Sequence, residues 1–185
     1  MSGATQSVTK YGHDPSWHFR GMKADVWEGG HHVPFIARWP GHIMSGSKSD
    51  ETICHTDLIA TAAAIVGHEL PATAGEDSYN ILPALKGEKY DKPIREATVH
   101  HSGAGQFAIR QGKWKLIIGG GSGGWTAPRR DEDAIKSGLP LIQLYDLNND
   151  IGEQNNLQDK HPEIVKELTD LLEKYKAEGK STPSK

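Results

Sequence analysis

The spacing of hydrophobic residues changes character near the middle of the chain. Residues 1 to about 30 show neither helical nor strand period, which predicts a loop. Val33 to Trp39 is mostly apolar and stops at Pro40-Gly41, which predicts a strand buried on both faces. Thr56 to Val66 carries apolar residues at helical spacing, with Thr56 as candidate N-cap and Gly67 at the C′ position. Strand, loop and helix in this order indicate an α/β unit.

The second half of the chain predicts a small antiparallel sheet covered by a terminal helix. Its short β-prone runs are Ala97 to His100, Phe107 to Arg110, Lys113 to Ile118 and Leu141 to Leu147. Gln111-Gly112 predicts a tight hairpin turn between two of them. Pro162 to Glu178 is strongly amphipathic, with proline at the first helical position and Gly179 as its stop, and predicts a helix.

The segments between these elements predict loops and a domain boundary. Leu70 to Lys92 is rich in Pro, Ala, Gly and charges, so we divide the chain into domains at 1–92 and 93–185. Gly119 to Gly124 holds five glycines and predicts a flexible loop without the pattern of a phosphate-binding loop. Asp131 to Asp133 predicts a solvated face, and Asp146 to Glu153 a turn that lacks the spacing of an EF-hand.

Composition excludes several classes of function. The formal net charge of −3 over 185 residues argues against nucleic acid as a partner, and no basic run indicates an anionic membrane surface. Leu58 to Val66, the longest apolar run, is too short to span a bilayer. Cys54 is the single cysteine, so no internal disulfide can form. Met1 to Lys10 lacks an apolar signal core, and the compartment is not assigned.

Candidate chemistry begins with one cation beside a glycine pair. Lys23 precedes Gly29-Gly30, and the segment then enters the predicted strand. Backbone that needs the conformational freedom of glycine, followed by a strand, is typical of pockets at strand ends in α/β enzymes. A flexible ammonium on such a loop suits a compact oxyanion, although a lysine in a loop can equally be only solvated. Glu28 is predicted to serve the structure of the loop.

The histidines do not predict a metal site. His31-His32 and His100-His101 are adjacent pairs, and adjacent residues on a strand point to opposite faces, so each pair offers at most one ligand. The sequence contains no H-x-x-x-H or C-x-x-C spacing that would support a metal cluster. His13 and His101 are candidate hydrogen-bond donors to an oxyanion, and ordinary surface or packed histidines remain an equal alternative.

Several segments, in order along the whole chain, resemble motifs of the sulfatase family of sulfate-ester hydrolases. They are His13-Asp14-Pro15-Ser16, Phe19-Arg20-Gly21, Lys23 to Glu28, Val33 to Gly41, Thr56 to Thr61, Ala108 to Ile117, Gln143 to Leu147, and Glu153 with Asn155 to Leu157. The resemblance implies the C-terminal portion of an alkaline-phosphatase-like α/β fold. It also implies that Lys23 binds sulfate, and we expect His13 and His101 to line the same pocket.

The chain departs from the family pattern at two ordinary positions and at the catalytic ones. His32 stands where the family usually has arginine, and Ile151 where it usually has proline. The complete family enzyme uses calcium and a formylglycine that attacks sulfur, made from the first residue of Cys/Ser-x-Pro-x-Arg. Cys54 is followed by His-Thr-Asp-Leu, and no Asp-Asn-Gly precedes Lys23. No cofactor or metal is therefore expected within this chain, and we expect it to be inactive alone.

The function expected from the resemblance is hydrolysis of an aryl or sugar sulfate by a complete enzyme, in which this chain is a C-terminal segment. The missing N-terminal portion is then its partner, and complete family members are often periplasmic or secreted. Three alternatives stay open: a non-catalytic module that binds sulfate or sulfated glycans, a remnant of a larger polypeptide, and a phosphatase or phosphodiesterase of the same superfold.

Overall fold

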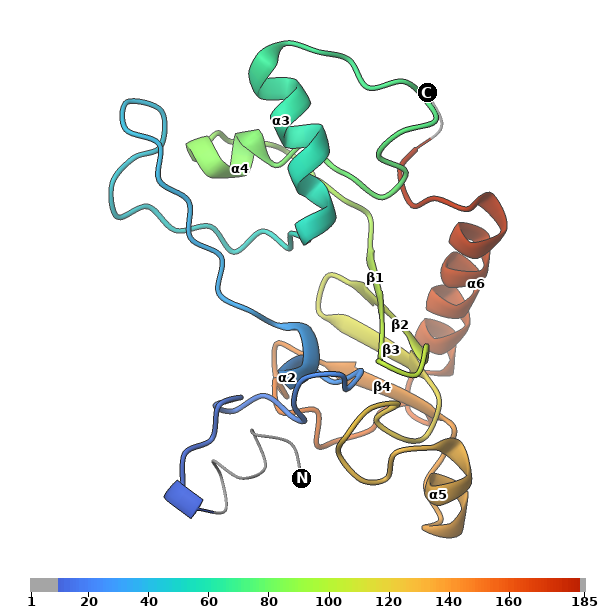
Figure 1. Cartoon of the computed structure of the whole chain (residues 1–185). Helices are drawn as coiled ribbons and strands as arrows, with labels where there is room; N and C mark the ends of the chain where they lie inside the picture. The colour runs from blue at the N-terminus through green and yellow to red at the C-terminus, as the bar shows by residue number, and fades with distance from the viewer. Residues whose placement is uncertain (1–9, 184–185) are drawn as a thin grey trace. The chain divides into compact units, whose positions relative to one another are not determined.

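A computed structural model describes residues 10–183, which form two compact units. The first unit consists of residues 10–33 and 99–172, and the second of residues 34–98 and 173–183 (Figure 1). Most of the polar N-terminus and the end of the tail, residues 1–9 and 184–185, lie outside the described residues. The division of this chain into domains at residues 1–92 and 93–185 stays a prediction.

The first unit is built on a four-stranded sheet with the order β1-β2-β3-β4. The strands are β1 (Thr98–His101), β2 (Phe107–Gln111), β3 (Trp114–Ile118) and β4 (Ile142–Asp146), each within one residue of its predicted bounds. β2 pairs antiparallel with β3, and β3 with β4. Because Gln111 pairs with Trp114, the hairpin turn is Gly112-Lys113, one residue later than predicted; Gly112 has the left-handed φ of 55° that the turn needs.

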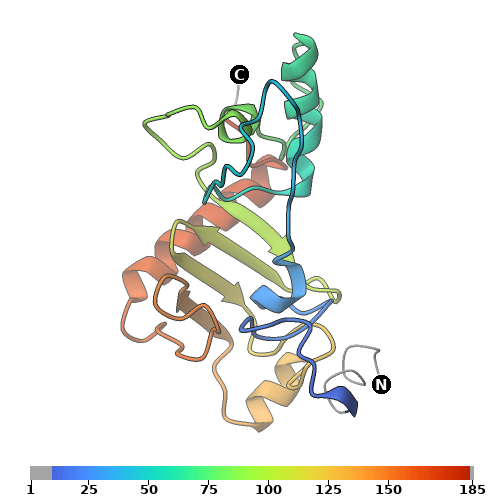
Figure 2. The same ribbon diagram turned by 90° about the vertical axis from the view of Figure 1, so that its left-hand side faces the viewer.

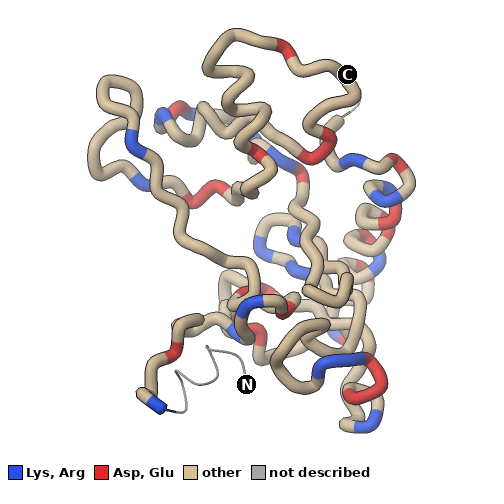
Figure 3. The backbone as a smooth tube through the Cα atoms, in the orientation of Figure 1, with Lys and Arg blue, Asp and Glu red and all other residues tan. Residues whose placement is uncertain are grey.

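One face of this sheet is covered by helix α6. Ile109, Leu116 and Leu144 are cross-strand neighbours on that face, and all three are fully buried. α6 (Pro162–Glu178) has its predicted bounds, and its first-unit part lies across the sheet in Figure 2. Its Leu168 and Leu172 are buried. Acidic and basic residues are interspersed along α6, as Figure 3 shows.

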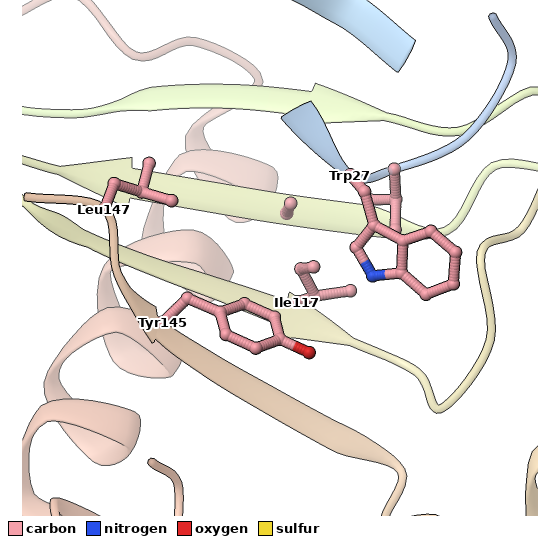
Figure 4. Close-up of a cluster of buried hydrophobic side chains, with 6 residues drawn as sticks. Trp27, Ile117, Tyr145 and Leu147 are labelled. Atoms are coloured by element: carbon pink, nitrogen blue, oxygen red, sulfur yellow. The ribbon is translucent and has the colours of Figure 1, made fainter. Parts of the chain in front are cut away.

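The other face of the sheet holds the N-terminal segment in place. A buried cluster joins Val26, Trp27, Ala108, Ile117, Tyr145 and Leu147 (Figure 4). Within it the Trp27 indole N–H and the Tyr145 hydroxyl both donate to Gln143 Oε1, at 3.0 and 2.8 Å. Alternation along the strands sends Ile117 and Tyr145 to this face and their neighbours to α6. The segment before residue 28 is therefore fixed on the sheet by burial and by hydrogen bonds.

The second unit contains a 3₁₀ turn, η1 (His55–Asp57), and two helices, α3 (Leu58–Val66) and α4 (Leu82–Lys86). Gly67 ends α3 in the left-handed region, as predicted. The predicted N-cap is wrong: the Thr56 hydroxyl donates to Asp77 O instead. Asp57, fully buried, accepts from Cys54 N at 2.7 Å and forms an ion pair with Arg95. A buried carboxylate therefore organises the start of α3.

The predicted buried strand at Val33 to Trp39 is wrong in this structure. These residues form neither a strand nor a helix, and Ile36 is 91% exposed. A strand needs a neighbour for its backbone N–H and C=O groups, and residues 10–183 place none beside this segment. Most of the apolar residues predicted for α3 are exposed too, with Leu58 at 54% and Val66 at 75%, while Ala63 is buried.

Two further segments bear on the functional site. Asp131 to Asp133 is exposed, as predicted, and opens the short helix α5 (Asp131–Lys136), which the sequence did not predict. Gly119 to Gly123 is buried, so the glycine run is a packed loop. A Cβ on Gly121 would lie 2.9 Å from Pro128 O, so glycine is needed there for close approach. Within residues 10–183, no helix is both long and apolar enough to cross a membrane.

Candidate functional site

Lys23 lies on an exposed loop whose backbone is held in unusual conformations. Gly21 and Ala24 both have left-handed φ values, 79° and 80°. Ala24 is not a glycine, so its conformation is maintained by its surroundings, including the hydrogen bond from Gly103 N to Ala24 O at 2.7 Å. The Lys23 side chain itself is exposed to solvent. The Lys23 ammonium is therefore exposed to solvent on a loop whose backbone conformation is fixed by its surroundings.

A buried carboxylate joins the Lys23 loop to the glycine-rich loop. Asp25 is 2% exposed, and its Oδ2 accepts from Met22 N at 2.8 Å and from the Thr126 hydroxyl. Its Oδ1 accepts from the backbone N–H groups of Trp125 and Thr126, at 2.6 and 3.1 Å. Trp125 lies beside Lys23 as a result, with 6.0 Å between Lys23 Nζ and the indole centroid. Hydrogen bonds to a charged acceptor are stronger than neutral ones, so the two loops are firmly connected.

The glycine pair serves close packing, and the expectation that its backbone uses the conformational freedom of glycine is wrong. Gly29 and Gly30 belong to the short helix α2 (Glu28–His31), and neither has a positive φ. A Cβ on Gly30 would lie 1.9 Å from Asp25 O, and one on Gly29 would lie 2.6 Å from Arg20 O. Only glycine lets α2 approach the Lys23 loop so closely.

The structure brings together the loops of two of the three predicted site residues. His101 ends β1 and is exposed; its Nδ1 lies 2.8 Å from Ser102 O. Two residues later, Gly103 donates to Ala24 O in the Lys23 loop. His13 is also exposed, and no described contact joins its side chain to Lys23 or His101. A common pocket for all three residues stays a prediction.

A buried charge cluster that the sequence reasoning missed lies under α2. Lys115, on β3, is fully buried, and its Nζ lies 2.9 Å from Glu28 Oε1 and 2.8 Å from Glu153 Oε1. His31 Nε2 is the third neighbour of the ammonium, at 3.1 Å. Glu28 also accepts from His32 Nδ1 at 2.9 Å, and Glu153 Oε2 accepts from Glu28 N at 2.7 Å. The ammonium of Lys115 thus forms ion pairs with two carboxylates and lies within hydrogen-bond distance of the His31 ring.

This cluster shifts the pKa values of its members in different directions. Burial favours the neutral form of Glu28, but the hydrogen bond with His32 and the charge of Lys115 outweigh it and lower the pKa of Glu28. Burial raises the pKa of Glu153. Burial and the nearby Lys115 charge lower the pKa of His31 to about 3 and that of His100 well below its ordinary value. Neutral His31 can therefore accept a hydrogen bond from Lys115 through Nε2.

One signal in the sequence could have revealed Lys115. In the run Trp114-Lys115-Leu116-Ile117, alternation places Lys115 on the same face as Ile117, which is buried. A lysine on a buried strand face requires a carboxylate partner. The predicted structural role of Glu28 agrees with its ion pair with Lys115. For Glu153 the sequence predicted only a turn, and its buried ion pair with Lys115 was not predicted.

The described residues do not fit the calcium and formylglycine that sulfatases generally use. No group of three or more His, Cys, Asp or Glu side chains within residues 10–183 is arranged to hold a metal ion. Of the buried carboxylates in the first unit, Glu28 and Glu153 are paired with Lys115, Asp146 is paired with Lys113, and Asp25 accepts hydrogen bonds from Met22 N and the Thr126 hydroxyl. Cys54 lies in the second unit, 3.3 Å from Arg95 Nη1, and burial raises the pKa of its thiol.

The known proteins to which this chain is similar in sequence are sulfatases. The chain is 35% identical over 168 residues to an N-acetylgalactosamine-6-O-sulfatase of Bacteroides thetaiotaomicron, covering 89% of the chain and 31% of that protein. It is 32% identical over 162 residues to arylsulfatase A of Homo sapiens, covering 80% and 31%. No protein-family model matches the chain.

Solved structures agree with these relatives. A Bacteroides thetaiotaomicron protein from work on glycosaminoglycan metabolism superposes with a TM-score of 0.76 at 34% identity, covering 93% of this chain and 35% of that one. A sulfatase from Pseudoalteromonas sp. shares the fold, with a TM-score of 0.67 at 24% identity, covering 94% and 34%. The chain thus spans about a third of the length of the relatives it matches. It belongs to the sulfatase family and has the α/β architecture of that family's alkaline-phosphatase-like fold.

Proposed function

We propose that this chain is the C-terminal portion of an arylsulfatase-like hydrolase and supplies a lysine that binds the sulfate group of the ester. The observation that carries the proposal is the placement of Lys23. Its side chain is exposed on a loop that the buried carboxylate of Asp25 fixes through Met22 N. A fixed loop limits the conformational entropy lost on binding, and an ammonium is a suitable point charge for sulfate oxygens.

The relatives support a sulfated sugar as the proposed substrate class. The Bacteroides relative is named for a sulfated amino sugar, and a solved structure 25% identical to this chain is a complex with a neocarrahexaose. We therefore take a sulfated sugar as the ligand of the Lys23 loop. His101 belongs to the proposed site because its loop is hydrogen-bonded to the Lys23 loop, and His13 belongs to it through the family motif alone.

The chemistry proposed for this chain by itself is binding without turnover. Lys23 attracts the sulfate in its ground state, but hydrolysis also requires a nucleophile at sulfur and a means to neutralise the developing charge. Cys54, the single cysteine, lies outside the family's nucleophile motif and has a raised pKa. We therefore expect no release of sulfate from an aryl sulfate by the purified chain, with or without added calcium. Calcium-dependent release would contradict this part of the proposal.

Lys23→Ala is expected to weaken binding of N-acetylgalactosamine 6-sulfate at least about tenfold, the loss of one charge-assisted contact at an exposed site. Isothermal titration calorimetry of the purified chain measures it. Lys136→Ala is the matched control, because Lys136 is an exposed lysine in the last turn of α5 and should leave binding unchanged. Equal weakening by both variants would indicate non-specific attraction, and unchanged binding by Lys23→Ala would remove Lys23 from the site.

A second candidate is a non-catalytic module that binds sulfated glycans. The observation that favours it is the engagement of Glu28 and Glu153 by Lys115, which commits these carboxylates to structure. The two candidates differ in one measurement. Adding the remainder of a sulfatase domain to the chain should restore sulfate release for a hydrolase segment, whereas a binding module should remain inactive in the same assay.

A further inference from the structure

We propose that Trp125 is the platform on which the sugar ring stacks while Lys23 holds its sulfate. The inference rests on the proposed function of Lys23 and adds to it the group that recognises the rest of the ligand. It assigns a role to Trp125, which directly follows the glycine-rich segment Gly119 to Gly124. The ligand class becomes a monosaccharide unit that carries the sulfate on the stacked ring.

The position of Trp125 is the first support. Its side chain is 43% exposed, and its ring centroid lies 6.0 Å from Lys23 Nζ. That separation is at the outer limit of cation–π attraction, so the ammonium does not cover the indole face closely. Both groups therefore remain accessible to a ligand at a short distance from each other. An exposed indole face can contact the apolar part of a ligand whose anionic group lies at the ammonium.

The second support is that the platform is pre-organised. Both the Trp125 N–H and the Thr126 N–H donate to Asp25 Oδ1, and the Ser122 hydroxyl donates to Thr126 O at 2.6 Å. Gly124 N donates to Ser122 Oγ at 3.0 Å, and a Cβ on Gly124 would lie 2.4 Å from Ala24 O. The glycines thus let the tryptophan loop pack against the lysine loop, and the backbone that carries the indole is fixed before any ligand binds.

The third support is the common frame of three loops. Val26 N donates to Ser122 O at 2.8 Å, and Ala104 N donates to Gly123 O at 2.9 Å. The loops of residues 22–26, 102–106 and 119–126 are therefore connected to one another by backbone hydrogen bonds. Lys23 lies on the first, His101 directly precedes the second, and Trp125 lies on the third. Lys23, His101 and Trp125 are therefore carried by segments that are hydrogen-bonded to one another.

The spacing selects the ligand. Because the ammonium and the indole are close, a ligand that contacts both must carry its anion on the ring that stacks. Inorganic sulfate is too small to use the platform and reaches Lys23 alone. An unsulfated sugar can stack but lacks the charge. The C–H groups on one face of a pyranose ring suit the flat apolar indole, and the sugar-sulfate relatives make a pyranose the ligand to which the proposal commits.

The test compares Trp125→Ala and Trp125→Phe with Trp17→Ala, an exposed tryptophan of the same unit that is 64% exposed. Calorimetry with the full chain uses N-acetylgalactosamine 6-sulfate, N-acetylgalactosamine, inorganic sulfate and 4-nitrophenyl sulfate. We expect Trp125→Ala to weaken the sugar sulfate about tenfold, in line with loss of one stacked ring. The affinity of Trp125→Ala for inorganic sulfate should change less than twofold. Trp125→Phe should retain part of the affinity for the sugar sulfate, and Trp17→Ala should bind the sugar sulfate as tightly as the unmodified chain.

Each other outcome is decisive. Sugar-sulfate binding that Lys23→Ala loses and Trp125→Ala keeps overturns the platform and leaves the sulfate site standing. Weakening of 4-nitrophenyl sulfate alone overturns the sugar assignment in favour of an aryl ligand. If Trp125→Ala loses binding of both inorganic sulfate and the sugar sulfate while its circular dichroism is unchanged, the platform is also overturned. Trp125 would then act by holding the Lys23 loop. Absence of binding to the unmodified chain overturns both proposals.

Discussion

Lys115→Met is expected to destabilise the chain by about 3–5 kcal/mol, the usual cost of removing one partner from a buried ion pair. Lys115 is fully buried, and its ammonium is the shared cation of Glu28 and Glu153, at 2.9 and 2.8 Å. Methionine fills a similar volume but leaves both carboxylates in the interior without a cation. The measurement is urea unfolding followed by tryptophan fluorescence at neutral pH.

The matched control is Lys113→Met, two residues away along the chain. Lys113 Nζ lies 2.8 Å from Asp146 Oδ2, but the Lys113 side chain is 43% exposed. Exposed ion pairs contribute about 0–1 kcal/mol, so this variant should unfold close to the unmodified chain. Equal losses in the two variants would contradict a special role for the buried cluster. Failure of Lys115→Met to fold at all, with Lys113→Met folded, would agree with it.

Lowering the pH from 7.5 to 5.5 is expected to shift the unfolding equilibrium toward the unfolded state by up to about a hundredfold. In the folded chain the pKa of His31 is lowered from its ordinary 6.5 to about 3, and that of His100 also lies well below 6.5. At pH values between the lowered pKa values and 6.5, these histidines bind protons in the unfolded chain but not in the folded chain. Stability therefore rises with pH through this window, by up to tenfold per pH unit for each histidine.

The two carboxylates of the cluster act in different pH ranges. The pKa of Glu28 is lowered, so its contribution is present above its unfolded value and is lost as the pH falls further, which extends the acid destabilisation. The pKa of Glu153 is raised, so its contribution has the opposite sign and is lost as the pH rises through the folded value. Glu153 can only reduce the slope that the histidines produce.

His100→Gln tests the origin of this pH dependence. It removes one titrating group while keeping a donor within reach of Val26 O, which His100 Nε2 contacts at 3.1 Å. Urea unfolding at both pH values should show a smaller difference than in the unmodified chain. His18→Gln, at an exposed position, is the control and should leave the difference unchanged. An unchanged difference in His100→Gln would refute the assignment.

Local pattern was sufficient for the elements that are stabilised by near neighbours in the chain. β2 and β3 are joined by a two-residue turn, and α6 has a clear apolar stripe between a proline and a glycine, so their bounds could be predicted closely. Val33 to Trp39 has an equally clear apolar pattern but forms no strand in residues 10–183. Its pattern encodes burial, and burial depends on partners that the pattern cannot supply.

The sequence by itself determined the family motifs, the four-stranded sheet, the terminal helix and Lys23 as the candidate sulfate ligand. Only the tertiary structure decided that Trp125 lies beside Lys23, that Gly29-Gly30 packs against another loop, and that Lys115 is buried between two carboxylates. The physical reason is sequence separation. The Asp25 bonds to Trp125 N and Thr126 N span 100 and 101 residues, and the Lys115 bond to Glu28 spans 87. Contacts of that range leave no periodic signal, because they arise only when the sheet has brought distant segments together.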